Sequence, residues 1–174
     1  MATTTRFPID LRVPGVTGNP GNAFWLPIVL TAATPGFDLG CWQFLLDVEG
    51  DIFGIINIPN TIGGTPAGKI ILTIAANATT GASRLSVDAR PIANDAESLD
   101  QVLDTTVAAQ DITLPATAYM TKEVSFTLPT SGNGFPVVAK DRLLIRLVHE
   151  GAHANDTLAV NTLLISAELE VDLT

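Results

Sequence analysis

The chain has 174 residues, of which 47% are hydrophobic and 16% are charged, a size and composition typical of one domain with a substantial core. Its net charge of −9, without any cluster of Lys and Arg, excludes the basic surface that binding to DNA or RNA requires, so no nucleic-acid partner is expected. The longest apolar runs fall far short of the roughly 20 residues that cross a bilayer, so no membrane partner is expected either.

The first 24 residues are rich in proline, glycine and threonine, which favour extended or turning backbone over a regular element. We predict an extended N-terminal arm over residues 1–24, followed by one domain over residues 25–174. Apolar side chains alternate with polar ones in the arm, so it could add an edge strand to a partner protein. The candidate partner-binding residues are Phe7, Ile9, Leu11 and Val13.

Beyond the arm, short apolar runs separated by Gly, Pro, Asn and Asp follow the pattern of strands and turns. The runs at 52–58 and 70–76 are apolar on both faces, which predicts strands covered on both sides, with a neighbouring subunit as one candidate cover. The clearest alternation puts Leu163, Ile165, Ala167, Leu169, Val171 and Leu173 on one face of a long strand. We predict nine strands in all, at residues 25–31, 41–47, 51–59, 69–77, 83–92, 105–114, 119–128, 141–150 and 162–172.

These strands are expected to form one antiparallel, jelly-roll-like β-sandwich, because no parallel βαβ pattern is present. The turn-like segment 77–81 predicts a hairpin between the strands on either side of it. Only residues 97–103 have helical spacing, and Asn94 with Glu97 resembles a capping arrangement, so we predict one short crossover helix there.

The residues of the sequence suggest no catalytic site, no cofactor and no metal. Its only imidazoles, His149 and His153, are followed by Asn155 and Asp156, a spacing that offers two nitrogens and a carboxylate to a metal. Because Gly151 interrupts this segment after a strand, we favour a polar loop with two solvated histidines. A metal or pH-responsive contact is the alternative.

Two other groups of side chains have a functional and a structural interpretation. Asp47, Glu49 and Asp51 flank an apparent turn, and a solvated turn is favoured over a calcium site because the order of EF-hand ligands is absent. Four aromatic residues offer surfaces for stacking on sugars, but most lie within apolar runs, so core packing is favoured. They are Trp25, Trp42, Phe53 and Tyr119. Cys41, the only cysteine, is expected to be buried and excludes an internal disulfide.

Several ordered motifs resemble a group of tailed-bacteriophage and prophage virion proteins. They begin with Phe-Gly-Ile-Ile-Asn-Ile-Pro-Asn at 53–60, Gly-Thr-Pro at 64–66 and a strand ending Ala-Ala-Asn-Ala-Thr-Thr-Gly at 75–81. They continue with the strand 86–90, Pro-Ile-Ala at 91–93, Glu-Ser-Leu-Asp at 97–100, the strand 142–149 and Asn-Asp-Thr-Leu at 155–158. The resemblance covers about residues 42–174 and leaves out the arm. It implies a β-sandwich structural subunit of a phage particle, without enzymatic activity.

Within that group, we expect a capsid decoration or cement protein that binds and stabilises the shell of the major capsid protein. Trimers suit the local threefold positions of an icosahedral lattice, so the expected partners are the major capsid protein and further copies of the chain in a homotrimer. Residues 1–8 lack the pattern of a secretory signal, so the expected location is the capsid surface of the virion after synthesis in the host cytoplasm. The alternative is a tail- or fibre-associated jelly-roll module that contacts host surface glycans, which exposed aromatic residues would favour.

Overall fold

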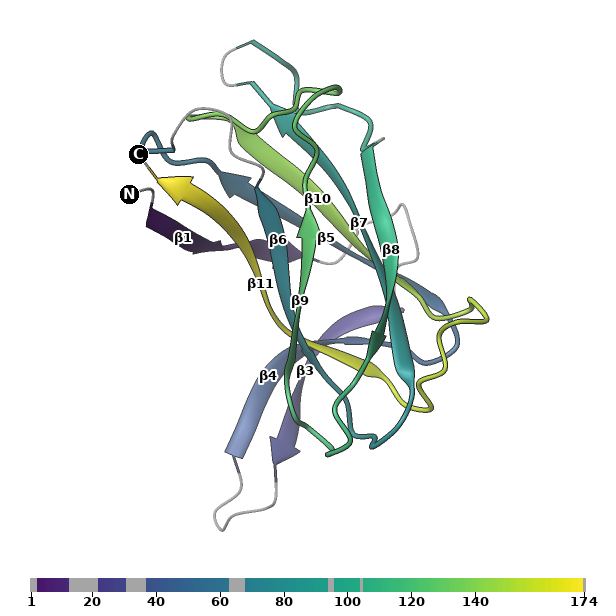
Figure 1. Ribbon diagram of the computed structural model, residues 1–174. Coiled ribbons are helices and arrows are strands. Elements are labelled where there is room, and N and C mark those ends of the chain that lie inside the picture. Colours follow the sequence, from purple (N-terminus) through teal and green to yellow (C-terminus); the bar gives the residue numbers. More distant parts are fainter. Residues whose placement is uncertain are drawn as a thin grey trace.

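Strands are the only regular elements that this sequence forms in the part of the chain that the structure describes. That part comprises residues 3–12, 22–30, 37–62, 68–93, 96–103 and 105–173. Figure 1 shows the computed structural model, in which the strands build two antiparallel sheets that pack against each other. The prediction of an all-β sandwich is therefore confirmed.

The two sheets are built from strands that lie far apart in the sequence. Across the first sheet the order is β3 (Ala23–Leu30), β4 (Phe37–Phe44), β11 (Thr162–Leu173), β6 (Lys69–Ala75) and β9 (Lys122–Thr127), with β1 (Thr3–Pro8) also paired to β11. Across the second sheet the order is β2 (Asp10–Arg12), β5 (Glu49–Asn57), β10 (Arg142–Glu150), β7 (Ala82–Ile92) and β8 (Thr105–Thr113). From β4 onward the chain changes sheet at every connection except β7 to β8, which is the crossing pattern of a jelly-roll-like sandwich.

The nine predicted strands are all present, with ends within four residues of the expected positions. The side chains of β10 show why the pattern was informative. Leu143, Ile145 and Leu147 are each 1% exposed or less, whereas Arg142 and Arg146 alternate with them on the outer face. Successive side chains of a strand point to opposite faces, so the apolar face fixes how the strand lies on the core.

Side chains from both sheets meet in one core, and each large one that is fully buried contributes about 1.5–3 kcal/mol relative to exposure. The largest are Phe44, Phe126, Ile52, Ile70, Leu72, Ile74, Leu85, Ile92, Leu128, Leu143, Ile145 and Leu147. A smaller cluster of Cys41, Ala75 and Leu163 lies apart from this core. The expectation that Cys41 is buried is confirmed.

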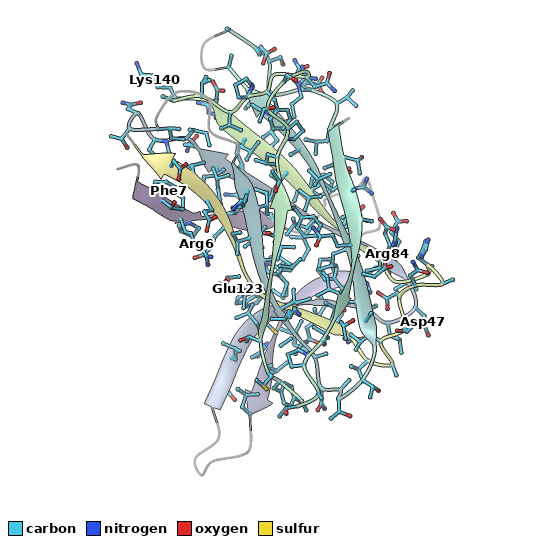
Figure 2. The ribbon with its side chains drawn as sticks, in the orientation of Figure 1. Arg6, Phe7, Asp47, Arg84, Glu123 and Lys140 are labelled. Atoms are coloured by element: carbon cyan, nitrogen blue, oxygen red, sulfur yellow. The ribbon has the colours of Figure 1, made fainter. Side chains whose placement is uncertain are left out.

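The predicted N-terminal arm is not an arm over residues 3–12. β1 pairs with β11 from Thr3–Leu173 to Pro8–Glu168, and β2 pairs with β5, so this segment adds one edge strand to each sheet of its own chain. Arg6 on β1 also forms an ion pair with Glu123 on β9, at 2.7 Å, although β11 and β6 lie between these two strands (Figure 2). The alternation in the sequence did predict an edge strand, but its partner is this domain. Residues 13–21 lie outside the described ranges, and the predicted boundary at residue 24 falls inside β3.

The predicted hairpin around residues 77–81 is also corrected. β6 lies between β11 and β9 in the first sheet, while β7 lies between β10 and β8 in the second, so the intervening turn carries the chain from one sheet to the other. Gly81 has a φ of +109°, and a Cβ at this position would lie 2.8 Å from the carbonyl oxygen of Thr157. The turn therefore packs against the loop between β10 and β11, a contact that local sequence does not reveal.

The predicted crossover helix does not form, since residues 97–103 have no helical turn. Two residues of its expected apolar face are not buried: Leu99 is 51% exposed and Val102 is 71% exposed. A helix this short is unstable in water unless packing holds it. The Glu97 carboxylate does accept a hydrogen bond from the backbone N–H of Ala93 at 3.1 Å, while Asn94 lies outside the described residues.

One hairpin extends beyond the sandwich body (Figure 1). β3 and β4 pair along all eight of their residues, but β4 pairs with β11 only over Trp42, Gln43 and Phe44. Beyond these three residues, β4 pairs with β3 alone. Side chains of the ribbon are therefore less covered, and Trp25 is 56% exposed and Leu26 is 49% exposed. Two grooves lie at the root of this hairpin.

Candidate functional site

The first groove, here called the amide groove, lies where the β3–β4 hairpin meets the ends of β6 and β11. It encloses about 360 Å³. Its walls come from five stretches of chain that only the tertiary fold brings together. They are lined by Ile28, Gln43, Asn77, Tyr119, Val160, Asn161 and Leu163. The lining thus combines one aromatic ring, three side-chain amides and three aliphatic side chains, and contains no ionised group.

Tyr119 occupies an unusual backbone conformation beside this groove. Its φ is +62°, in the left-handed region that a bulky residue rarely adopts. The strain is held in place by the backbone hydrogen bond from Tyr119 N–H to the carbonyl of Ala76, at 2.7 Å. The ring remains 37% exposed. Residues held in such conformations concentrate at ligand-binding sites, so the loop from β8 to β9, beside a groove, is a candidate place for a ligand.

The amides differ in how much of their hydrogen-bonding capacity the protein already uses. The Asn161 side-chain oxygen accepts a hydrogen bond from Leu46 N–H at 3.1 Å, which orients its NH₂ group. Gln43 is 8% exposed, and its NH₂ group donates to the carbonyl of Leu26 at 3.5 Å. Within the described residues, neither the Asn77 amide nor the Tyr119 hydroxyl makes a side-chain hydrogen bond. Amides donate and accept at once, which matches ligand hydroxyl groups.

The second groove, here called the aromatic groove, lies on the other side of the hairpin root and encloses about 400 Å³. Trp25 and Trp42 meet in it edge to face, with ring centroids 5.7 Å apart and ring planes at 72°. Its lining is Pro8, Ile9, Asp10, Leu11, Trp25, Trp42, Ile165, Ser166 and Ala167. The expectation that the aromatic residues pack in the core is therefore wrong for Trp25 and Tyr119. Trp42 and Phe53 are half-buried.

The interpretation of two solvated histidines is wrong for His149. Its side chain is buried, and Nε2 lies 2.9 Å from Asp156, whose carboxylate also accepts a hydrogen bond from Arg84 N–H at 2.8 Å. A carboxylate only accepts, so Nε2 carries the proton, and buried Nδ1 makes no hydrogen bond of ordinary geometry. Burial lowers the pKa of His149 below 6.5, although Asp156 and the Val48 carbonyl act in the opposite direction.

This buried imidazole predicts a pH-dependent stability. Because the folded state holds His149 neutral while the unfolded chain protonates it near pH 6.5, the free energy of unfolding should fall as pH drops below 6.5. The slope is at most about 1.4 kcal/mol per pH unit for one group. Urea unfolding between pH 8 and 5 measures it. His149→Gln should flatten the slope, whereas His153→Gln, at an exposed position, should leave it unchanged. Equal slopes in the two variants would contradict this assignment.

The acidic turn is also only partly solvated. Asp47 and Glu49 are exposed, as expected, but Asp51 is fully buried and both its oxygens accept from Arg146, at 2.9 and 3.0 Å. A second arginine on the same face of the second sheet, Arg84, binds Glu150 and Asp111. Its hydrogen bond holds the pKa of Asp111 below the ordinary value. These acids are structural partners of arginine side chains.

Two further kinds of feature concern the described part of the chain, a metal-ligand cluster and a membrane-spanning helix. No group of three His, Cys, Asp or Glu side chains within that part is arranged to hold a metal ion. His153 is exposed, as expected, whereas His149 is buried. The same part contains no helix that could span a membrane.

The predicted partner-binding residues lie on the inside of the N-terminal strands. Ile9 is 7% exposed and belongs to the core, while Phe7 and Leu11 pack against it. Val13 lies outside the described residues. Leu11 and Ile9 cover Gly54, where a Cβ would lie 2.7 Å from the Ile9 side chain. Their role in binding another protein stays a prediction, and the surface they offer is small.

No protein-family model and no curated protein matches the sequence. Among solved structures, a family 35 carbohydrate-binding module from Clostridium thermocellum is similar with a TM-score of 0.50 and 13% identity, over 97% of this chain and 98% of that one. An isomalto-dextranase from Arthrobacter globiformis T6 complexed with panose gives a TM-score of 0.48 and 19% identity over 95% of this chain, which spans only 23% of that enzyme. The first of these likenesses shows the β-sandwich fold alone, and neither supports the virion resemblance.

The sequence named Tyr119 but missed its three amide neighbours. Asn77 stood out only as part of a turn, and Gln43 and Asn161 carry no local signal at all. Their common position arises because β4, β6 and β11 are adjacent in the sheet although they are distant in sequence.

Proposed function

We propose that this chain is a non-enzymatic β-sandwich module that binds a neutral saccharide in the amide groove. The observation that carries the proposal is the Tyr119 ring, held exposed in a strained conformation beside three side-chain amides. An aromatic ring offers a flat apolar surface to the C–H face of a sugar, while amides bind the hydroxyl groups at its rim. The groove therefore matches both kinds of surface that a pyranose presents.

The lack of charge in the lining narrows the class of saccharide. A uronic or sialic acid buried in the groove would need a cationic partner, because an unpaired carboxylate is costly to desolvate. None of the seven lining residues is charged, and the whole chain carries a net charge of −9. The proposal is thus restricted to uncharged glycans. The fold is also one on which a carbohydrate-binding module is built, which agrees with the proposal without identifying a ligand.

Tyr119→Ala should weaken saccharide binding by about tenfold or more, equivalent to about 1.4 kcal/mol. Isothermal titration calorimetry with cellohexaose, maltohexaose, isomaltohexaose and β-1,4-galactotriose would measure the binding. Asn77→Ala should also weaken it. Met120→Ala is the matched control, because Met120 is 54% exposed in the same loop but does not line the groove.

The melting temperature of Tyr119→Ala should not fall, since an exposed ring at a strained position contributes little to the core. If every panel saccharide that binds does so equally to wild type and Tyr119→Ala, the amide groove is not the site. If none of the four binds at millimolar concentration, the proposal of a neutral-saccharide module fails for these classes of linkage.

As the second candidate function, we propose that the chain is a structural subunit of a phage virion. In its more specific form, this proposal gives the chain two kinds of partner, the major capsid protein and further copies of itself in a homotrimer. The observation in its favour is the pair of exposed apolar side chains of Leu99 and Val102, which lie in an irregular connection. Co-sedimentation with capsid shells should then be lost in the double variant Leu99→Ser and Val102→Ser. Co-sedimentation of wild type and variant to the same extent would show that these residues are not the contact.

A further inference from the structure

We propose that the aromatic groove is a second saccharide subsite, in which a pyranose ring stacks on the open face of Trp25. This inference rests on the proposed saccharide function, but it concerns different residues on the opposite side of the β3–β4 hairpin. The consequence is a module that binds two glycan segments at once.

The position of Trp25 is fixed by a glycine beneath it. A Cβ on Gly40 would lie 2.5 Å from Cζ2 of Trp25, so the indole lies directly over the backbone of the neighbouring strand. Trp42 supports it from the side in an edge-to-face contact. One face of Trp25 is therefore held against Gly40, and the side chain is still 56% exposed. Because the indole is already held in place, a ligand that stacks on it loses little binding free energy to ordering of this side chain.

The rest of the groove is formed by a gap along one edge of β11. On this edge β4 pairs as far as Leu164, and hydrogen bonding to the N-terminal segment begins at Ala167, whose carbonyl accepts from Ile9 N–H at 2.9 Å. Residues 165 and 166 therefore lie between two strand partners. The pairing of β11 with β6 shifts register between Leu164 and Ser166, and such bulges redirect side chains next to binding sites. The bulge places Ile165 and Ser166 in the lining of the groove.

The polar groups of the groove suit a neutral ligand with hydroxyls. Ser166 offers a hydroxyl, and the Asp10 carboxylate is already neutralised by Arg12 at 2.6 Å. Asp10 is 61% exposed and can accept from a sugar hydroxyl without being desolvated. The apolar floor and the few polar groups at its rim match one ring with an apolar face and a polar edge.

The two grooves lie on opposite faces of the same strand. Trp42 lines the aromatic groove, while Gln43, its immediate neighbour in β4, lines the amide groove. Successive residues of a strand point to opposite faces, so a short oligosaccharide in one groove does not extend straight into the other. Two glycan segments bound in this way would raise the avidity of the module for a surface with many glycans.

Tryptophan fluorescence tests this subsite separately, because the chain contains two tryptophans and both line the aromatic groove. The probes are the same four oligosaccharides. We expect saturable quenching or a shift of the emission in wild type. Gly40→Ala, which keeps both indoles but displaces Trp25, should raise the fluorescence-derived Kd at least fivefold. Tyr119→Ala should leave this Kd unchanged, and so should Leu26→Ala, an exposed residue of β3 that lines neither groove.

The outcomes separate this inference from the proposed function. If calorimetry detects a saccharide that leaves tryptophan emission unchanged at saturation, the amide groove stands alone and the second subsite is refuted. Equal fluorescence-derived Kd values for wild type and Gly40→Ala would also refute it, with the emission spectrum of the free variant reporting whether Trp25 has moved. If calorimetry and fluorescence both show no binding, both proposals fail together.

Discussion

Replacing Arg146 by alanine should destabilise the domain by about 3–5 kcal/mol, the usual cost of removing one partner of a buried ion pair. Its guanidinium group binds both oxygens of Asp51 and lies 3.3 Å from an oxygen of Asp88. The Asp51 side chain is fully buried, and that of Asp88 is 10% exposed. Without the Arg146 cation, these carboxylates keep their desolvation penalty and lose much of the interaction that offsets it. Urea unfolding at pH 7 measures the loss.

Arg142→Ala is the matched control for this substitution. Arg142 lies four residues earlier on the same face of β10, but it is exposed, so its removal should change the free energy of unfolding by less than about 0.5 kcal/mol. Adding Asp51→Asn to Arg146→Ala should recover part of the loss, because an amide costs less to bury than a carboxylate. A loss below 1 kcal/mol in Arg146→Ala, with no recovery in the double variant, would show that solvent already screens this pair.

The strands could be predicted because burial of one face leaves a period of two in the sequence. In β11 this alternation of faces is interrupted, so the period of two predicts the buried side correctly for only part of the strand. The sequence put Leu163, Ile165 and Ala167 on one face, but the register shift between Leu164 and Ser166 reverses the sides. Leu163 and Ile165 therefore pack with Cys41 outside the main core, while Leu164 and Ala167 lie within it. A bulge adds one residue to one strand and has no signature in composition.

Long-range pairing was the information that the sequence lacked. The run at 70–76 is apolar on both faces, which made a neighbouring subunit one candidate cover and motivated the expectation of a trimer. In the structure Ile71 is 4% exposed and Ala75 is 2% exposed within the single chain. This run therefore no longer argues for a trimer, which stays a proposal. The candidate site was hidden for the same reason, since Gln43, Asn77 and Asn161 meet only after β4, β6 and β11 have paired.

Deleting residues 1–12 should unfold most of the molecules or lower the free energy of unfolding by at least about 4 kcal/mol. Substituting a buried isoleucine such as Ile9 by alanine alone costs about 2–5 kcal/mol. The deletion also removes Phe7 and Leu11 from the core margin and all hydrogen bonds of β1 to β11. A typical domain has only about 5–15 kcal/mol in total, so the remaining sandwich would be marginal. Circular dichroism with thermal and urea unfolding measures the change.

Two single variants separate the causes of this loss. Ile9→Ala should reproduce about half or more of it by opening a cavity over Gly54, while Arg12→Ala should have little effect because its side chain is 74% exposed and its ion pair with Asp10 is at the surface. A truncated chain with the melting temperature of the full one would mean that β1 and β2 add no stability to the sandwich. The segment would then be available to pair with another protein, as the alternation of Phe7, Ile9 and Leu11 first indicated. A cooperative loss in the truncated chain and in Ile9→Ala would instead show that these side chains are part of the core, because their removal exposes the apolar surface of β5 and β11 that they cover.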